Sequence, residues 1–276
     1  RRPRVVVYDP AGGLEGLIGA EATRIASLGT LPAPPAVLVI GAGAFPGDPR
    51  GLPRLGIVGE TDQALAAFVR EGGRVLVLHQ VAYPSWIGTG RLTNQASTMT
   101  FAQMPDHPVL RGITDRDLKW WASPPGAPAD HLVTGDECAR PANGAFRAVV
   151  VSGSAGGIAH APLLELPRGR GVLLLCQMLV QEKASVEPVA ARLLANLLGY
   201  AAHYRAEPAR ATLVSGSAEA AAAHDAVGLR YLDVREGPSP EDLDNSDLVI
   251  ASRRVSDARE LHALEERGKT RHLLCP

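Results

Sequence analysis

The chain has 276 residues, of which 46% are hydrophobic and only 4% aromatic, and its formal net charge is −1. This length predicts two domains, and the composition predicts a core built mainly from Leu, Val and Ala. Because the charge is near zero and no block of like charges occurs, nucleic acid and anionic membranes are not expected as partners. The apolar runs are shorter than the roughly 20 residues that span a bilayer, so we expect a soluble chain.

The first eighty residues alternate between strand-like and helix-like patterns. The stretch "RVVVYD" at 4–9 is a continuous apolar strand, and a helix is predicted from about Gly13 to Ser27. The second strand is "AVLVIGAGAF" at 36–45, and the third is "RVLVL" at 74–78. Runs of this kind are typical of strands that are buried on both faces of a parallel sheet.

A second helix is predicted between the second and third strands. Thr61 is its expected N-cap, and the residues expected to face inward are Leu65, Phe68 and Val69. Gly72 and Gly73 are expected to end it, because glycine tolerates the left-handed turn that follows many helices. The resulting βαβαβ order predicts an α/β fold with a doubly wound, mostly parallel sheet and right-handed crossovers.

Residues 81–130 are rich in Pro, Gly, Ser and Thr and show little periodicity, which predicts a long excursion over the carboxyl ends of the strands. Three strands are then expected in succession, with some antiparallel pairing, at "FRAVVVS", "GIAHAPLLEL" and "GVLLLCQ". The closing helix is amphipathic, with apolar residues at helical spacing at Ala190, Leu193, Leu194, Leu197, Leu198 and Ala201.

The pattern of the first strands starts again after a charged stretch that contains a proline. "ATLVSGS", "DLVIAS" and "DARELHALEERGKTRHLL" resemble the first strand, the second strand, and the helix with the third strand. We therefore predict an α/β domain over 1–205, a linker at 206–210 and a partial second α/β domain over 211–276. Since the first residue is Arg1 and a strand-like stretch ends the sequence, we expect a piece of a longer polypeptide.

The turn after the third strand is the first place to look for a functional site. In open parallel sheets, ligands and catalytic groups gather where the carboxyl ends of strands meet. His79 and Gln80 occupy this turn. A nucleophile elbow of the G-x-S-x-G type needs small residues beside the nucleophile, whereas the neighbours here are Leu78 and Val81. The residues therefore do not predict a nucleophile at this turn.

Several stretches together resemble a known fold family. They are "EGGRVLVLHQ", "DHPVLRGITDRDLKWW", "PLLELPRGRGVLLLCQ" and "PVAARLLANLLGY". Over about residues 3–204 the chain is similar to the class I glutamine amidotransferase-like fold. It most resembles the degenerate, non-catalytic versions found in bacterial family 2 (β-galactosidase-like) glycoside hydrolases and in β-galactosidase trimerisation domains. The resemblance implies an accessory domain with a structural or oligomerising role.

This sequence departs from the catalytic pattern of that family at two places. An active amidotransferase of this fold would carry a Cys at the third-strand elbow and a His-x-Glu pair after a late strand. The elbow carries His79 and Gln80, and the late strand ends in Cys176 and Gln177 with no His following. Cys176 as a relocated nucleophile remains an alternative, but a Cys in this setting is more often a small buried hydrophobe. We predict no catalytic residues.

The other residues that could take part in catalysis have simpler structural interpretations. A glycosidase could use the carboxylates of the excursion, which are Asp106, Asp115 and Asp117, and that of Glu165 on "PLLEL". However, Asp115 and Asp117 belong to "TDRD", a typical helix start in which acidic residues cap free N–H groups. If the parent protein is a glycosidase, its catalytic pair is expected on another domain.

No cofactor or metal site is predicted. The three cysteines are far apart, and the histidines His107, His131 and His160 do not form a metal-binding spacing. "GAGAF" lacks the third glycine and the acidic residue that a dinucleotide-binding motif needs, so it is predicted to be a tight turn.

The aromatic residues are unevenly distributed. All three tryptophans lie in the excursion. Such side chains can fill the space beneath a long loop, anchor the domain on a neighbouring domain or identical subunit, or stack on a sugar. The candidate ligand-binding residues are His79, Gln80, Tyr83, Trp86, Trp120 and Trp121.

Three functions remain open from the sequence. The first is a non-catalytic accessory module of a bacterial glycoside hydrolase, and its partners would be other domains of the parent chain or identical subunits. The second is a module that binds a carbohydrate or another small polar ligand, and the third is a Cys-dependent hydrolase or amidotransferase. The sequence does not determine the cellular compartment, which is either the bacterial cytoplasm or the exterior, if the chain is exported with a longer parent chain.

Overall fold

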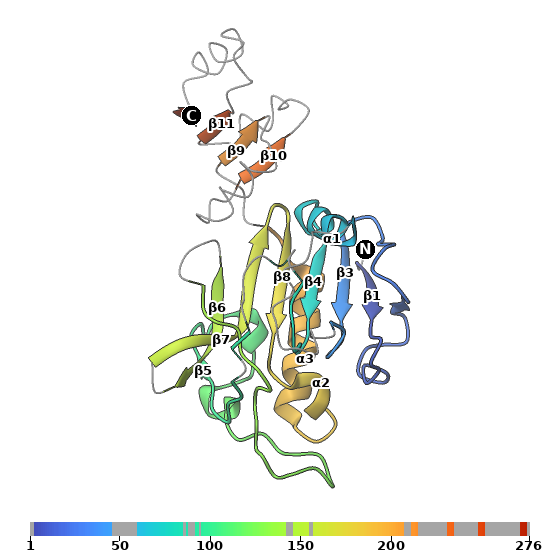
Figure 1. Ribbon diagram of the computed structural model, residues 1–276, viewed down its shortest axis with the longest axis vertical. Helices are drawn as coiled ribbons and strands as arrows, with labels where there is room; N and C mark the ends of the chain where they lie inside the picture. Colours follow the sequence, from blue (N-terminus) through green and yellow to red (C-terminus); the bar gives the residue numbers. More distant parts are fainter. Residues whose placement is uncertain are drawn as a thin grey trace.

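A computed structural model describes residues 3–45, 60–84, 87, 92–93, 95–141, 146–154, 157–206, 211–214, 231–234, 248–251 and 271–274. These residues form an eight-stranded sheet and a separate four-stranded sheet (Figure 1). No described helix is long and apolar enough to cross a membrane.

The eight-stranded sheet has the order β2-β1-β3-β4-β8-β7-β6-β5. Its strands, in chain order, are β1 (Arg4–Tyr8), β2 (Thr23–Arg24), β3 (Ala36–Ile40), β4 (Arg74–Val77), β5 (Phe101–Ala102), β6 (Arg147–Ser154), β7 (Gly157–Arg168) and β8 (Gly171–Cys176). The five strands from β2 to β8 are parallel, whereas β7, β6 and β5 continue the sheet in antiparallel pairing. The predicted α/β fold with a mostly parallel sheet is confirmed, as is the antiparallel pairing among the later strands.

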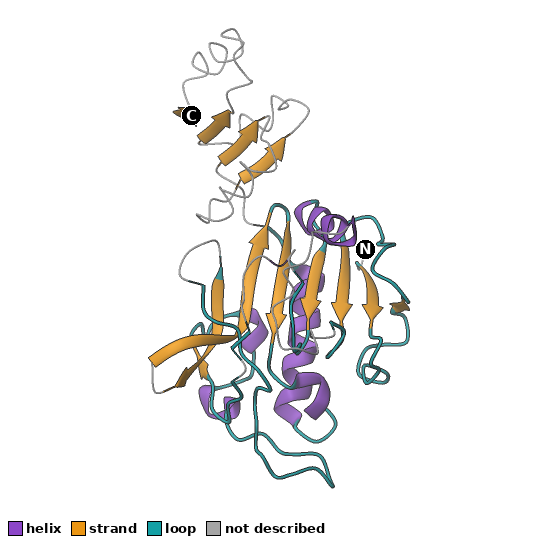
Figure 2. Cartoon of the chain, in the orientation of Figure 1, coloured by secondary structure: helices purple, strands orange, loops and turns teal. Residues whose placement is uncertain are grey.

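Helices cover both faces of the parallel half of the sheet (Figure 2). Alternate residues of each strand point to opposite faces. Val6, Leu38 and Val75 belong to the core that contains α1 (Glu60–Arg70), whereas their neighbours in the strands belong to the core that contains α3 (Pro188–His203). The remaining helical segments are α2 (Val180–Lys183) and the 3-10 turns η2 (Pro108–Leu110) and η3 (Asp115–Leu118). Burial on both faces explains why these strands read as continuous apolar runs.

Helix α1 follows the predicted pattern at its inward face and at its end. Leu65, Phe68 and Val69 are buried. The chain leaves the helix through Gly72, whose φ is +111°, and the N–H of Gly73 donates to the carbonyl of Phe68 over 2.8 Å. The helix includes Glu60, so Thr61 lies inside it and not at the cap that the sequence predicted.

The helix predicted from Gly13 to Ser27 is wrong. This segment consists of turns and the short strand β2, which pairs with β1. Gly13, Gly16 and Gly19 each cost a helix interior roughly 1 kcal/mol relative to alanine, and Gly13 and Gly16 have positive φ here. A hydrogen bond of 2.9 Å from the N–H of Leu14 to the Asp9 carboxylate fixes the first turn in place of a helical one. The apolar spacing of the segment was therefore outweighed by its glycines.

The excursion has more regular structure than its composition predicted. It contributes the edge strand β5 and the turns η2 and η3, and Leu118 and Trp121 anchor it in the core. Its last residue, Asp130, pairs with Lys183 of α2, the short helix that follows β8. The excursion thus reaches the strand ends at Asp130, while β5 forms an edge strand of the sheet.

The four-stranded sheet is parallel and has the order β10-β9-β11-β12. Its strands are β9 (Ala211–Val214), β10 (Tyr231–Val234), β11 (Leu248–Ala251) and β12 (Arg271–Leu274). The order repeats that of β2-β1-β3-β4, with β10 in the place of β2, so the strand order of the first sheet recurs in the second. The domain boundaries at 205, 206–210 and 211 remain a prediction.

Candidate functional site

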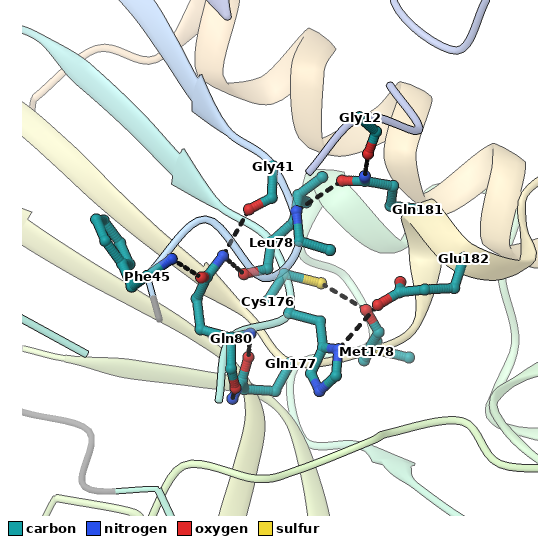
Figure 3. Close-up of polar contacts among 12 residues, drawn as sticks. Gly12, Gly41, Phe45, Leu78, Gln80, Cys176, Gln177, Met178, Gln181 and Glu182 are labelled. Carbon is teal, nitrogen blue, oxygen red and sulfur yellow. Dashed lines mark hydrogen bonds and ion pairs between the residues drawn. The ribbon is translucent and has the colours of Figure 1, made fainter. Parts of the chain in front are cut away.

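Four segments converge where the parallel strands end (Figure 3). They follow β1 at Asp9–Gly13, β3 at 41–45, β4 at 78–81 and β8 at 177–183. This edge is the expected position of a site in an open parallel sheet. We call it the carboxyl edge.

His79 follows β4 and forms a pair with a carboxylate from α2. The Nδ1 atom of His79 lies 2.8 Å from Oε1 of Glu182, and the side chains are 19% and 36% exposed. The backbone of Gly135 closes on the other ring nitrogen, because a Cβ atom at this position would lie 2.6 Å from Nε2 of His79. The imidazole is thus oriented on one side and covered on the other.

Gln80 is fully buried, and its side chain joins the loops that follow β3 and β4. Its Oε1 atom accepts from the N–H of Phe45 over 2.9 Å, and its Nε2 atom donates to the carbonyls of Gly41 and Leu78 over 2.7 and 2.8 Å. Gln177 in turn binds the backbone of Gln80, accepting from its N–H over 2.7 Å and donating to its carbonyl over 2.9 Å. Figure 3 shows these two amide side chains beside each other. The side chains of Gln80 and Gln177 therefore both form hydrogen bonds that connect the loops of this edge.

The backbone N–H groups of residues 41–45 and of Gln80 are occupied by internal acceptors. Ala42 donates to Oε1 of Gln181 over 2.8 Å, Phe45 to Gln80, and Gln80 to Gln177. The N–H groups of Gly41, Gly43 and Ala44 donate to the carbonyls of Tyr8, His79 and Gly41. An oxyanion hole needs free donors aimed at the position where negative charge develops. Here the N–H groups of Ala42, Phe45 and Gln80 already donate to glutamine carbonyl oxygens.

The short helix α2 joins the loops of this edge through three consecutive side chains. Gln181 bridges the Ala42 N–H and the Gly12 carbonyl, the latter over 2.9 Å, and Glu182 holds His79. Lys183, buried to 96% at its side chain, donates to the Leu132 carbonyl over 2.7 Å and pairs with Asp130 over 3.1 Å. The stretch "QEK" therefore links segments that lie far apart in the sequence.

Both cysteines within the described residues are buried, and burial disfavours the ionised form of their thiols. Cys176 has no exposed surface, and burial raises the pKa of its thiol to about 12. Burial likewise raises the pKa of Cys138 to about 12, and its Sγ atom lies 3.6 Å from the Tyr83 hydroxyl. A thiol with such a pKa is not ionised at neutral pH, which favours the interpretation of Cys176 as a buried hydrophobe.

The candidate ligand-binding residues do not gather in one place. His79 and Gln80 share the carboxyl edge, while Tyr83 packs on the core that contains α1. Trp121 is buried in the opposite core, where its Nε1 atom donates to the Asp117 carbonyl over 2.9 Å. Trp120 is 62% exposed. Trp86 lies outside the described residues.

Trp120 has a backbone conformation that its side chain does not favour. Its φ is +50°, in the left-handed region that suits Gly and Asn. Leu118 before it and Trp121 after it are both buried, so the kink lies between two core residues. The indole of Trp120 points outward, and the fold does not require a large ring there.

We expect Trp120→Asn to be more stable than Trp120→Ala by about 0.5–1 kcal/mol, because Asn tolerates the left-handed conformation and both variants lose the ring. The midpoints of urea denaturation provide the measurement. Equal midpoints, or a more stable Ala variant, would contradict the assignment of strain to this position.

The carboxylates of the excursion and of β7 have structural partners. Asp117 closes a capping box with Thr114, as the sequence predicted, and Asp115 accepts from the Ala102 N–H and pairs with Lys119. Asp106 is exposed. Glu165 is fully buried and accepts from three side chains, His107 over 2.9 Å, Arg147 over 2.7 Å and Tyr200 over 2.8 Å. This network ties β7 to β6, α3 and the excursion.

The histidines outside the carboxyl edge are also dispersed. His107 belongs to the Glu165 network, His160 on β7 contacts Glu137, and His131 is exposed. Within the part of the chain that the structure describes, no group of three or more His, Cys, Asp and Glu side chains could hold a metal ion.

Sequence reasoning overlooked Gln181, Glu182, Lys183 and Gly135. The stretch "QEK" lies four residues after a buried strand, near the edge where side chains reach the loops of neighbouring strands, and that position was the available signal. Gly135 gave no local signal, since it is required by a contact with His79, which lies 56 residues earlier in the chain.

No family model matches the sequence, and no curated protein matches it. Among solved structures, the chain is similar to a cytoplasmic protein from Salmonella typhimurium, with 12% identity, a TM-score of 0.44, and 73% of this chain and 100% of that chain covered. It is also similar to a ThuA-like protein from Bacteroides uniformis, with 9% identity, a TM-score of 0.45, and coverage of 74% and 94%.

A third similar structure is an exo-β-1,4-mannosidase from an Opitutaceae bacterium. The identity is 14%, the TM-score is 0.39, and the match covers 75% of this chain and 37% of that chain. With TM-scores below 0.5, these similarities carry no argument about activity. The sheet itself defines the class of the protein, which is an α/β protein with a mixed eight-stranded sheet.

Proposed function

We propose that this chain is a non-catalytic accessory module, structural or oligomerising, of a bacterial glycoside hydrolase of the β-galactosidase-like type. The observation that carries the non-catalytic part is the filled carboxyl edge. Gln80, Gln177 and Gln181 accept hydrogen bonds from three backbone donors of this edge, where a nucleophilic enzyme of this fold class would keep donors free for its substrate. The glycoside hydrolase part depends on the resemblance of residues 3–204 to such accessory domains.

The energetic cost of reopening this edge supports the same proposal. Removal of a buried amide leaves several backbone groups without partners, and each such group costs about 1–3 kcal/mol. A substrate would have to replace these hydrogen bonds before any chemistry could begin. The arrangement suits a module that is selected for rigidity.

The purified chain tests the non-catalytic part. We expect no ammonia release from glutamine, no hydrolysis of p-nitrophenyl β-galactoside, and no modification of native Cys138 or Cys176 by iodoacetamide at neutral pH. Turnover of either substrate that survives repeated purification and is lost in Cys176→Ala would establish the Cys-dependent enzyme instead.

The native polypeptide that contains this chain tests the glycoside hydrolase part. We expect it to hydrolyse aryl β-galactosides, with carboxylates on another domain as its catalytic pair. If that polypeptide hydrolyses no aryl glycoside, the accessory role survives but its assignment to a glycosidase fails.

A second candidate function is the binding of a carbohydrate or another small polar ligand. Trp120 favours this function, because its indole is exposed, its backbone is strained, and exposed residues in strained conformations occur often at binding sites. In this case titration with galactosides is expected to shift the tryptophan fluorescence of the wild-type chain but not that of Trp120→Asn. If galactosides do not change the fluorescence of the wild-type chain, the ligand-binding function is contradicted and only the structural role remains.

A further inference from the structure

The end of the sheet opposite the carboxyl edge is rich in arginine. We call it the amino edge and define it by residues 3–5, 33–36, 70–74, 167–172 and 203–206, where the parallel strands begin and β7, α1 and α3 end. Figure 1 shows the turn between β7 and β8 at this end of the sheet, away from α2. The basic side chains of the amino edge are Arg4, Arg70, Arg74, Arg168, Arg170 and Arg205, together with His203, and its one acidic residue is Glu71.

Positive charge is thus concentrated at the amino edge. Because the formal net charge of the whole chain is −1, the rest of the chain carries an excess of acidic residues. Arg4 begins β1, Arg74 begins β4, Arg168 ends β7 and Arg170 precedes β8. Since neighbouring strands lie about 4.8 Å apart, the arginines extend over roughly 20 Å along the strand order from β1 to β7.

Hydrogen bonds to the backbone fix the middle of the amino edge. The N–H of Arg170 donates to the carbonyl of Arg70 over 2.9 Å, which joins the turn between β7 and β8 to the end of α1. Nη2 of Arg74 donates to the carbonyl of Tyr204 over 3.0 Å, which joins the start of β4 to the residue before Arg205. Four of the arginines therefore start from one connected frame.

The guanidinium groups of the amino edge have no acidic partner among the residues that the structure describes. None of the ion pairs between those residues includes one of these six arginines. The Nε atom of Arg74 is buried and has no hydrogen-bond partner. Burial lowers the pKa of Arg74, and no described carboxylate opposes that shift. A partly buried cation without a counter-charge is costly, so the amino edge favours the approach of an anion.

The length of the amino edge indicates which kind of anion fits it. Arginine pairs with both carboxylates and phosphates, but a single small anion reaches only adjacent side chains. An extended peptide rises about 3.3 Å per residue, so a stretch of about six residues matches the roughly 20 Å that the arginines cover. Single-stranded nucleic acids also stack their bases on exposed aromatic rings. The only Phe, Tyr or Trp of the amino edge is Tyr204, and it is buried.

We propose that the amino edge is a docking surface for an extended, acidic protein segment that belongs to a neighbouring domain or subunit of the parent protein. This inference rests on the proposed accessory role, to which it adds the surface and the chemistry of the partner. Arg74 lies in the middle of the surface and is the anchor, because a carboxylate supplies the counter-charge that it lacks. The exposed Arg4, Arg170 and Arg205 extend the contact on both sides.

Binding of a fluorescein-labelled hexaglutamate peptide to the full chain tests this proposal. Fluorescence anisotropy at about 0.15 M salt is the measurement, since more weakly placed charges are screened under this condition. We expect saturable binding of hexaglutamate and no binding of labelled hexaglutamine. The double variant with Arg74→Gln and Arg170→Gln is expected to weaken hexaglutamate binding about tenfold or more, because it removes a partly buried and an exposed partner of the carboxylates.

The matched control is the double variant with Arg111→Gln and Arg116→Gln. It removes the same charge from exposed positions of the excursion and is expected to change the affinity less than about twofold. If Arg74→Gln prevents folding, Arg170→Gln with Arg205→Gln removes two exposed side chains and is expected to weaken binding about threefold or more.

The proposal is overturned if hexaglutamate does not bind, or if the two double variants lose equal affinity. Tighter binding of a single-stranded hexathymidylate than of hexaglutamate would assign the amino edge to nucleic acid, and displacement of the peptide by an equal concentration of inorganic phosphate would assign it to a small anion. Either result also overturns the proposal. Enzymatic turnover by a chain that still binds hexaglutamate would contradict only the non-catalytic part of the proposed function, so the two failures are distinguishable.

Discussion

Replacement of Glu165 by glutamine is expected to lower the free energy of unfolding at neutral pH by about 3–5 kcal/mol, because the buried partners lose their charged acceptor. Glu165 is fully buried and receives hydrogen bonds from His107, Arg147 and Tyr200. The N–H of Val109 donates to Nδ1 of His107 over 3.4 Å, so Nε2 carries the hydrogen that Glu165 accepts. Arg147 is thus the cation of the network.

The pH dependence of this effect follows from the pKa of Glu165. Burial by itself raises this pKa, but the hydrogen bonds from His107 and Tyr200, together with the charge of Arg147, outweigh burial and lower it below its ordinary value of 4.5. The ionised carboxylate therefore contributes stability that is present above the ordinary pKa and is lost as the pH falls through the lowered one. The difference between wild type and Glu165→Gln is expected to shrink on acidification below about pH 4.

Denaturation with urea at neutral and at acidic pH provides the measurement. Tyr200→Phe is the matched control, because it removes one hydrogen bond to Glu165 and keeps the charge, at an expected cost of about 1.5 kcal/mol. A Glu165→Gln variant as stable as the wild-type chain at neutral pH would show that the network is not a source of stability.

Replacement of Gln80 by alanine is expected to cost about 2–4 kcal/mol, because in a dry environment it removes the partner of the Phe45 N–H and one donor each from the Leu78 and Gly41 carbonyls, of which Gly41 keeps the Ala44 N–H. Gln181→Ala is the matched control. It removes an amide that also bridges one backbone donor and one backbone acceptor, but near the surface, where water can replace it. We expect this second variant to cost about 1 kcal/mol or less.

The comparison of these two variants distinguishes a rigid carboxyl edge from an open one. Thermal or urea denaturation measures the stabilities, and amide hydrogen exchange at Phe45 reports whether the loop at 41–45 loosens locally. Equal costs for Gln80→Ala and Gln181→Ala would mean that water already reaches Gln80. The edge would then be an open pocket, contrary to the proposed function.

The sequence alone determined the parts of this protein that depend on local pattern. The apolar runs at 4–9, 36–45 and 74–78 specify buried parallel strands, because only a strand covered on both faces tolerates side chains that are apolar at every position. The spacing of Leu193, Leu194 and Leu197 specifies the closing helix in the same way. Apolar spacing was misleading at Gly13–Ser27, where it resembles that of a helix but the glycines disfavour one.

Only the tertiary structure decided what the carboxyl edge does. The sequence placed His79 and Gln80 at the end of a strand, but it did not reveal that Gln177 and Gln181 occupy the backbone donors of that edge. These hydrogen bonds join residues 139 and 97 positions apart, and they depend on which strands are neighbours in the sheet. The tertiary structure also decided the different positions of Trp120 and Trp121. These two adjacent residues are of one type, but Trp120 is exposed and Trp121 is buried. The backbone angle at Trp120 that separates them is set by packing and not by their identity.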